Sequence, residues 1–339
     1  MRDTDFETCR AAIQTGSYSF YAASKLLPAN IRNPAYVLYA FCRLADDAVD
    51  LTKSKSEAVL SLRDRLDRVY RGDPLDTPVD RAFAQVVKEY HMPFELPEAL
   101  LEGLAWDAEG RRYQTVDDLM DYCARVASAV GAMMCVLMGV RHRDTLARAC
   151  DLGLAMQLTN IARDLGEDRE EGRIYVPLDW LEETGVSAEK FLRTTSATNE
   201  SRGYARRLLK HADHFYRRSE AGVPALPLQA RTGIFAARYI YGAIGKEIAR
   251  NGFDSITQRA VTSKGTKLRL LLWSGLRAAQ LSLLPQSPIL HATPDPSVRF
   301  LINAASITSD TKSGWFERAD ALLDVLAKLE KANSHMGPK

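Results

Sequence analysis

Three acidic residues, Asp164, Glu167 and Asp168, directly follow an apolar run of the chain, within the stretch NIARDLGED at residues 160–168. Carboxylates repel one another, and burying them costs free energy unless a cation lies beside them. Residues four apart share one face of a helix, so the two aspartates would point the same way. The stretch therefore raises the possibility of a cation-binding site on an otherwise apolar helix.

A second acidic stretch, YAFCRLADDAVD at residues 39–50, repeats this arrangement. In both stretches an arginine, Arg43 or Arg163, comes just before acids that are spaced four apart. Such acids are also common on solvated helix faces, where their repulsion costs only about a few tenths of a kcal/mol. A binding site is favoured here because each helix carries a line of polar side chains, with oxygen ligands among them, through apolar surroundings. The line consists of Tyr39, Arg43, Asp46 and Asp50 on the first helix, and of Gln157, Asn160, Asp164 and Asp168 on the second.

Magnesium is the cation that these ligands fit best. It prefers hard oxygen ligands, keeps several waters, and is usually held by one or two carboxylates together with substrate phosphates; Mn²⁺ could take its place. The six histidines and five cysteines are scattered, so no site for a softer metal is predicted. Arg43 and Arg163 would offer forked donors to phosphate oxygens. A diphosphate site in an apolar helical cavity implies an anionic head and a long hydrocarbon tail, and so a prenyl diphosphate substrate.

The elements that must position these residues have helical periodicity almost throughout. The segments 116–139 and 144–162 are apolar nearly all round, as expected of central helices in a large bundle. The sequence predicts an all-α protein, a single large helical bundle around a central apolar cavity. Its helices are expected at about 5–15, 17–27, 32–51, 56–71, 79–91, 97–109, 116–139, 144–170, 200–221, 227–251, 264–282 and 314–332.

No Gly/Ser-rich linker divides the chain, but residues 284–312 are rich in proline and serine. We therefore expect a catalytic domain at 1–283, followed by an irregular segment and a terminal helix within 284–339. The basic helix at 264–282 could belong to the core or rest on a membrane surface.

Composition excludes several other classes of protein. A net charge of +2 gives no field that would favour nucleic acid. The chain contains neither a P-loop nor a strand-linked G-x-G-x-x-G motif. The five cysteines form no C-x-x-C pair, which suggests reduced core residues. The N-terminus lacks a signal sequence, and no run of 18 uncharged apolar residues occurs, so a cytoplasmic protein without a transmembrane helix is expected.

At these motifs the chain resembles the squalene/phytoene synthase family, and most closely its bacterial phytoene synthases of carotenoid biosynthesis. The resemblance covers about residues 10–280 and rests on four stretches. They are GSYSFYAASKLLP at 16–28, YAFCRLADDAVD at 39–50, YCARVASAVG at 122–131 and AMQLTNIARDLGEDREEGRIYVP at 155–177.

The resemblance implies an isoprenoid-synthase type of bundle and a role for each matching residue. It implies metal ligation by Asp46, Asp50, Asp164 and Asp168, supported by Asn160 and Gln157. Diphosphate would be bound by Arg43 and Arg163, and also by Arg259, where the local match is looser. The cavity near the reacting carbons would be lined by Ser17, Phe20, Tyr39, Tyr122 and Tyr241.

The implied reaction is the head-to-head condensation of two geranylgeranyl diphosphates to phytoene through a cyclopropyl diphosphate, without NADPH. Two features leave alternatives open. Ala124 stands where many members have a second tyrosine, and Asp47 also fits the DDxxD motif of head-to-tail enzymes. A fifteen-carbon donor would give dehydrosqualene or hydroxysqualene instead, and a non-catalytic isoprenoid-binding protein could share the fold. Because the product is a hydrocarbon, peripheral contact with the inner membrane surface is also expected.

Overall fold

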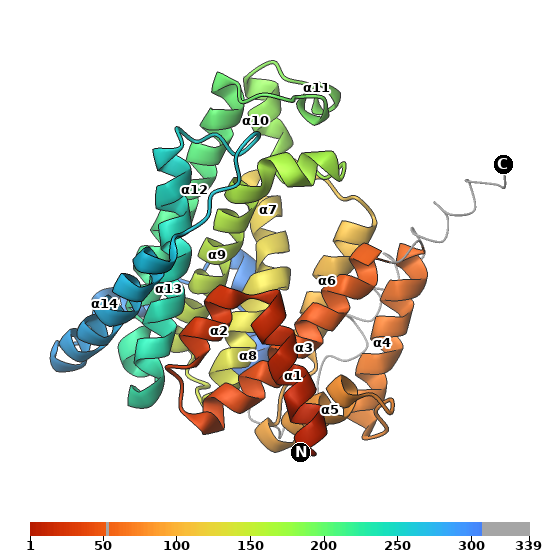
Figure 1. Ribbon diagram of the computed structural model, residues 1–339, viewed down its shortest axis with the longest axis vertical. Coiled ribbons are helices and arrows are strands. Elements are labelled where there is room, and N and C mark those ends of the chain that lie inside the picture. The colour runs from red at the N-terminus through yellow and green to blue at the C-terminus, as the bar shows by residue number, and fades with distance from the viewer. Residues whose placement is uncertain (52–53, 307–339) are drawn as a thin grey trace.

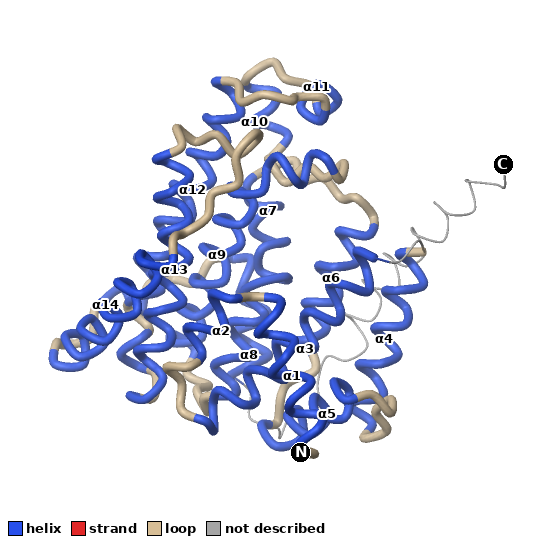
Figure 2. Tube along the Cα trace, viewed as in Figure 1, coloured by secondary structure: helices blue, strands red, loops and turns tan. Residues whose placement is uncertain are grey.

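The computed structural model describes residues 1–51 and 54–306, except for the side chains of residues 50 and 51. The predicted terminal helix at 314–332 lies outside the described residues. Within the described part of the chain, helices are joined by loops and no strand occurs (Figure 2). The prediction of an all-α bundle is therefore confirmed.

Two long helical rods occupy the middle of the bundle (Figure 1). One is α9 (Arg143–Glu170). The other is continuous from α7 (Val116–Cys123) through a π-helical turn (Ala124–Ser128) into α8 (Ala129–Leu137). The remaining long helices surround these rods: α1 (Asp3–Gly16), α2 (Tyr18–Ser24), α3 (Ala29–Leu51), α4 (Lys55–Arg71), α5 (Pro78–Tyr90), α6 (Glu95–Ala108), α12 (Asn199–Glu220), α13 (Leu228–Arg250) and α14 (Lys264–Leu283).

Two glycines allow the central rods to touch backbone to backbone. A Cβ atom on Gly153 of α9 would lie 2.6 Å from the backbone nitrogen of Ser128, and one on Gly131 would lie 2.7 Å from the carbonyl oxygen of Ala149. The Ser128 hydroxyl donates to the Cys150 carbonyl at 2.7 Å across the same contact. Larger side chains would push the rods apart, so these glycines fix their spacing.

The structure differs from the sequence-based expectation in several places. The helix expected at 116–139 contains the π-helical turn, and the one expected at 17–27 is only Tyr18–Ser24. The stretch at 284–312, expected to be irregular, contains a short helix, α15, in its described part. Elements that periodicity missed are α10 (Leu178–Glu183), α11 (Ala188–Leu192), α15 (Arg299–Ser306) and 3-10 turns at Val223–Ala225, Pro288–His291 and Pro296–Val298.

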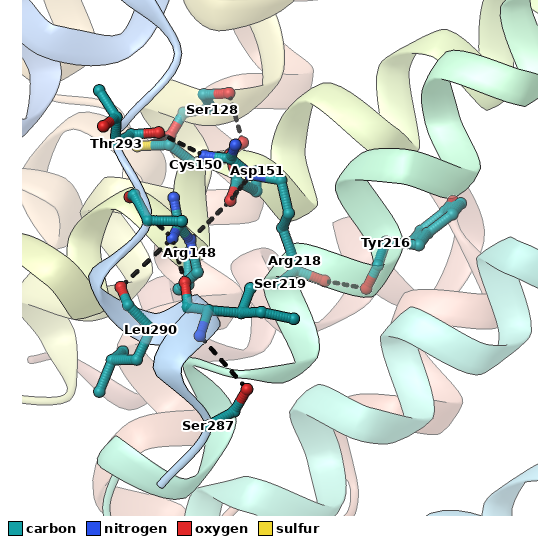
Figure 3. Close-up of polar contacts among 12 residues, drawn as sticks. Ser128, Arg148, Cys150, Asp151, Tyr216, Arg218, Ser219, Ser287, Leu290 and Thr293 are labelled. Atoms are coloured by element: carbon teal, nitrogen blue, oxygen red, sulfur yellow. Dashed lines mark hydrogen bonds and ion pairs between the residues drawn. The ribbon is translucent and has the colours of Figure 1, made fainter.

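A buried ionic cluster attaches this C-terminal stretch to the bundle (Figure 3). Arg148 and Asp151 of α9 pair at 2.6 Å with fully buried side chains, and Arg218 of α12 reaches the same carboxylate oxygen at 3.0 Å. Arg148 also donates to the carbonyls of residues 289, 290 and 292, and Arg218 donates to that of Thr293. We call Arg148, Asp151 and Arg218 the closed triad, because its arginines are also committed to backbone carbonyls.

By length and composition alone, one stretch of the described chain, Val116–Leu137, could cross a membrane. In the structure, 61% of its most apolar window is buried inside the protein. That burial and its place in the middle of the bundle are those of a core helix (Figure 1).

Candidate functional site

A cavity of about 330 Å³ lies between α9 and the helices around it, with walls from α1, α2, α3, the π-helical turn, α8 and α13. One face of α9 lines the cavity from Asn160 through Met156, Leu152 and Ala149 to Thr145. At a rise of 1.5 Å per residue, that face extends over roughly 22 Å. Most of the lining is apolar, so the cavity suits a long hydrocarbon.

Polar and aromatic side chains gather at the Asn160 end of the cavity, which we call the polar end. Tyr39 of α3 lines it together with Gln157 and Asn160 of α9. Phe20 of α2 and Tyr241 of α13 also line the cavity and stack with ring centroids 4.9 Å apart. The structure thus brings five of the predicted site residues to one cavity. Both acidic stretches continue beyond this end, one along α3 and the other along α9.

On α3, the acids lie about two and three turns beyond Tyr39. Arg43 bridges them, with Nη2 2.6 Å from Asp47 and Nη1 3.4 Å from Asp46. These side chains are 40–47% exposed, so solvent or a ligand can reach them. Asp50 follows on the same helix, but its side chain lies outside the described residues.

On α9, the regular helix is interrupted at Asp164, whose φ of −102° and ψ of 15° are not helical. This sparsely populated region of backbone conformation is one in which active-site residues are often found. Just beyond the break, the Gly166 amide donates to the Ser255 carbonyl at 2.8 Å. A Cβ atom on Gly166 would lie 2.4 Å from the Ile256 carbonyl oxygen, so glycine is required for this approach.

The approach at Gly166 brings a third arginine to the acidic helix. Asp164 accepts two hydrogen bonds from Arg163, at 2.8 and 2.6 Å, and one from Arg259 at 3.0 Å. Arg259 also lies 3.3 Å from Glu167 and is half exposed. We call Arg163, Asp164 and Arg259 the open triad, since an arginine with this exposure can turn toward an incoming anion.

Asp168, one turn beyond Asp164, is a buried carboxylate whose neighbouring positive charge does not offset the cost of its burial. Burial raises its pKa to about 8, and the nearby Asp164 and Asp107 carboxylates raise it too, while Arg173 acts in the opposite direction. A cation near Asp168 would lower this pKa, because it would favour the ionised form of the carboxylate.

The same end of the cavity carries an oxygen that lacks a partner. Asn160 Oδ1 is buried and accepts no hydrogen bond. Among the described residues, no three His, Cys, Asp or Glu side chains are grouped to hold a metal ion by themselves. That fits Mg²⁺, which is usually bound by one or two carboxylates and completes its shell with waters and substrate phosphates. The donor set of Asn160, Asp164 and Asp168 is therefore compatible with a divalent cation shared with a diphosphate.

Two of the five residues that were predicted to line the cavity lie away from its lining. The Ser17 hydroxyl caps α2 by accepting from the Phe20 amide at 3.3 Å. The Tyr122 hydroxyl donates to Asp107 at 2.8 Å, and Tyr175 donates to the other oxygen of Asp107 at 2.6 Å. Neither Ser17 nor Tyr122 is among the residues that line the cavity.

The contacts of Tyr122 show a group that sequence reasoning did not assemble. Burial and the Asp107 charge hold the pKa values of Tyr122 and Tyr175 well above the usual range, so both hydroxyls remain donors. Asp107 in turn raises the pKa of Asp168. Tyr175 lies in the quoted stretch EGRIYVP, which could have indicated it, whereas nothing near Asp107 distinguishes it from a surface acid.

Comparisons with known proteins point to one family. Residues 13–266 match the family model described as squalene/phytoene synthase. The chain is 56% identical to a phytoene synthase of Cereibacter sphaeroides, with 96% of this chain and 94% of the relative covered. It is 53% identical to a phytoene synthase of Rhodobacter capsulatus, with 97% and 96% covered. Among solved structures, a dehydrosqualene synthase in complex with a ligand has a TM-score of 0.76 at 30% identity, covering 82% of this chain and 97% of that chain.

Proposed function

The chain belongs to the squalene/phytoene synthase family, and we propose that it condenses two molecules of geranylgeranyl diphosphate head to head into phytoene, releasing diphosphate. One observation carries this proposal, the 56% identity to a phytoene synthase over almost the whole of both chains. The Cereibacter and Rhodobacter relatives bear the same name, which favours phytoene over the products of a fifteen-carbon donor.

The length of the cavity supports a twenty-carbon donor. An isoprene unit adds four carbon–carbon bonds of about 1.5 Å to the chain, and hence about 5 Å when extended. Four units then span about 20 Å, close to the roughly 22 Å over which α9 lines the cavity. A fifteen-carbon tail would leave the Thr145 end unfilled.

The arginines and acids beyond the polar end of the cavity would bind the diphosphate head group of the substrate. Arg43, Arg163 and Arg259 would grip diphosphate oxygens through forked N–H donors. Asp46, Asp50, Asn160, Asp164 and Asp168 would hold the divalent cation, with Gln157 beside them. Once bound, Mg²⁺ would neutralise the negative charge that develops on the leaving diphosphate; Mn²⁺ could replace it.

The residues that line the cavity would then act on the carbocations that form when diphosphate leaves. Loss of diphosphate from the first donor would give an allylic cation. The double bond of the second donor attacks this cation, and loss of a proton closes the ring of a cyclopropyl diphosphate. That intermediate loses its own diphosphate, rearranges to a linear 1–1′ skeleton and loses a second proton; the two released diphosphates can accept the two protons. The rings of Phe20, Tyr39 and Tyr241 can stabilise passing positive charge. The apolar lining excludes water, which would trap each cation as an alcohol.

Loss of a proton ends this sequence, so no NADPH is expected. The test is to incubate the purified protein with Mg²⁺ and either geranylgeranyl or farnesyl diphosphate, without NADPH, and to identify the extracted hydrocarbon. We expect a forty-carbon product from the longer donor and no product in EDTA. A thirty-carbon product from farnesyl diphosphate alone would contradict the proposed substrate. If neither donor reacts with correctly folded protein, the non-catalytic binding protein gains support.

The product also suggests where the enzyme works. Phytoene does not dissolve in water and must pass into a lipid phase, so we expect a cytoplasmic enzyme that contacts the inner membrane surface peripherally. A catalytic unit at residues 1–283, followed by a separate C-terminal segment, also remains a proposal. Deleting residues 284–339 tests it, since a unit that ends at 283 should still fold and turn over. Unfolding of the shortened protein would show that the backbone of residues 289–293, which Arg148 and Arg218 hold, belongs to the unit.

A further inference from the structure

Helix α14 has its apolar side chains on the wrong face for a helix in water. Its inward face buries Ser274 and Ala278, whereas large apolar side chains point outward. Their exposed fractions are 61% for Leu268, 69% for Leu272, 50% for Trp273, 65% for Leu276 and 86% for Leu283. We call these five residues the outward face of α14. Contiguous exposed apolar patches of this kind mark interaction surfaces.

The charges on α14 indicate the kind of partner. The helix contains no acidic residue but carries four cations, Lys264, Lys267, Arg269 and Arg277. An apolar face bordered by lysine and arginine suits an anionic lipid surface, where tryptophan is also favoured at the boundary. A second copy of this chain fits less well, because a symmetric dimer through α14 would bring like charges together.

The position of α14 connects this surface to the cavity. The helix packs on α13 at the periphery of the bundle (Figure 1), and α13 lines the cavity through Gly233, Ile234 and Tyr241. Lys267 also lies 5.4 Å from the ring of Tyr18, an exposed residue that begins the cavity-lining helix α2. A membrane at α14 would therefore lie beside two walls of the cavity.

We propose that the outward face of α14 docks on an anionic membrane surface and places the two adjoining cavity walls next to the lipid. The proposal rests on the proposed function, because a hydrocarbon product gives the enzyme a reason to meet a bilayer. It goes further by assigning the contact to five residues of one helix.

The test compares binding of the full-length protein to vesicles of phosphatidylglycerol and phosphatidylcholine with binding to phosphatidylcholine alone. The substitution Leu272→Glu should lower partitioning onto the anionic vesicles by about tenfold or more. It removes apolar area that the membrane would bury, and it adds a negative charge. The matched control is Leu60→Glu, which changes an exposed leucine on α4, on the other side of the bundle (Figure 1). It should bind like the unchanged protein.

Three outcomes would overturn the proposal: no binding of the unchanged protein to anionic vesicles, equal loss in both variants, or a light-scattering dimer that only Leu272→Glu dissociates. A photo-crosslinker at position 272 that captures residues 307–339 of the same chain in the presence of vesicles would also overturn it. Activity on geranylgeranyl diphosphate in detergent micelles is measured in parallel. It should be unchanged in Leu272→Glu, so failure of docking and failure of the proposed function can be told apart.

Discussion

Helix α9 contributes an arginine and an aspartate to each of two Arg–Asp–Arg triads, and a second arginine from elsewhere in the chain, Arg218 or Arg259, completes each one. In the closed triad, Asp151 has no exposed side-chain surface, and both arginines also hold carbonyls of residues 289–293. In the open triad, Asp164 is 16% exposed and Arg259 is half exposed. Burial raises the pKa of Asp151 inside the closed triad, and beside the open triad it raises the pKa of Asp168 to about 8.

This contrast indicates that surroundings, rather than residue types, distinguish a structural ion cluster from a candidate binding site. A buried cluster whose arginines are committed to carbonyls resists change, and removing one member leaves an uncompensated charge. In the cluster at the polar end of the cavity, Arg259 is half exposed and a further acid, Asp168, lies nearby. We expect these groups to exchange their partners for an anion and a cation. Substitutions of the aspartates of the two triads should therefore differ in their effects on stability and on catalysis.

The largest effect should come from the closed triad. Asp151→Ala should lower the free energy of unfolding by about 3–5 kcal/mol, because it leaves Arg148 buried without its carboxylate. Urea denaturation measures this change. Asp164→Ala is the matched control and should cost less than half as much; equal losses would mean that the two triads are not distinct.

Catalysis, in contrast to stability, should depend on the open triad. Asp164→Asn should lower kcat by about 100- to 1000-fold at saturating Mg²⁺, a magnitude typical for loss of one electrostatic contact to a transition state. Asp213→Asn, at an exposed carboxylate that pairs only with Arg217 among the described residues, should leave kcat unchanged. Steady-state kinetics would measure kcat for both variants, once their secondary structure has been shown to be intact. An Asp164→Asn enzyme within twofold of the unchanged protein would remove the open triad from the site.

A smaller effect should appear at the Thr145 end of the cavity. Thr145→Met should shorten the cavity and lower kcat/KM for geranylgeranyl diphosphate by about tenfold, since a methylene or two is worth that much in an apolar pocket. Farnesyl diphosphate should be affected less, and the isosteric Thr145→Val should behave like the unchanged protein. Competition between the two donors measures the ratio, and an unaltered ratio would place the tail elsewhere.

The most gradual effect is one of pH, spread over several pH units. Because the folded protein raises the pKa of Asp168 from 3.8 to about 8, the folded state holds this proton more tightly than the unfolded state. In metal-free protein, the free energy of unfolding should therefore fall as the pH rises from about 4 to about 8, by no more than about 1.4 kcal/mol for each pH unit. Asp168→Asn should lack this part of the slope. The same slope in both proteins would show that Asp168 titrates normally.

How far the sequence could predict these features depends on whether they are local. The acid lines along α3 and α9 follow from helical spacing, so the polar end of the cavity could be predicted. The meeting of Arg259 with Asp164 depends on the close approach of residues 255–256 to Gly166, which no local pattern reveals. The 3-10 turn at Pro288–His291 was missed for the same reason, because distant Arg148 and Arg218 hold the carbonyls of residues 289–293.

The most direct test of this account is a crystal structure of the protein with Mn²⁺ and a thiodiphosphate analogue of geranylgeranyl diphosphate. We predict anomalous density for manganese beside Asp164 and Asp168, the head group between Arg163 and Arg259, and the tail along α9 toward Thr145. The closed triad should be unchanged. Manganese bound elsewhere, or a tail outside this cavity, would contradict the account.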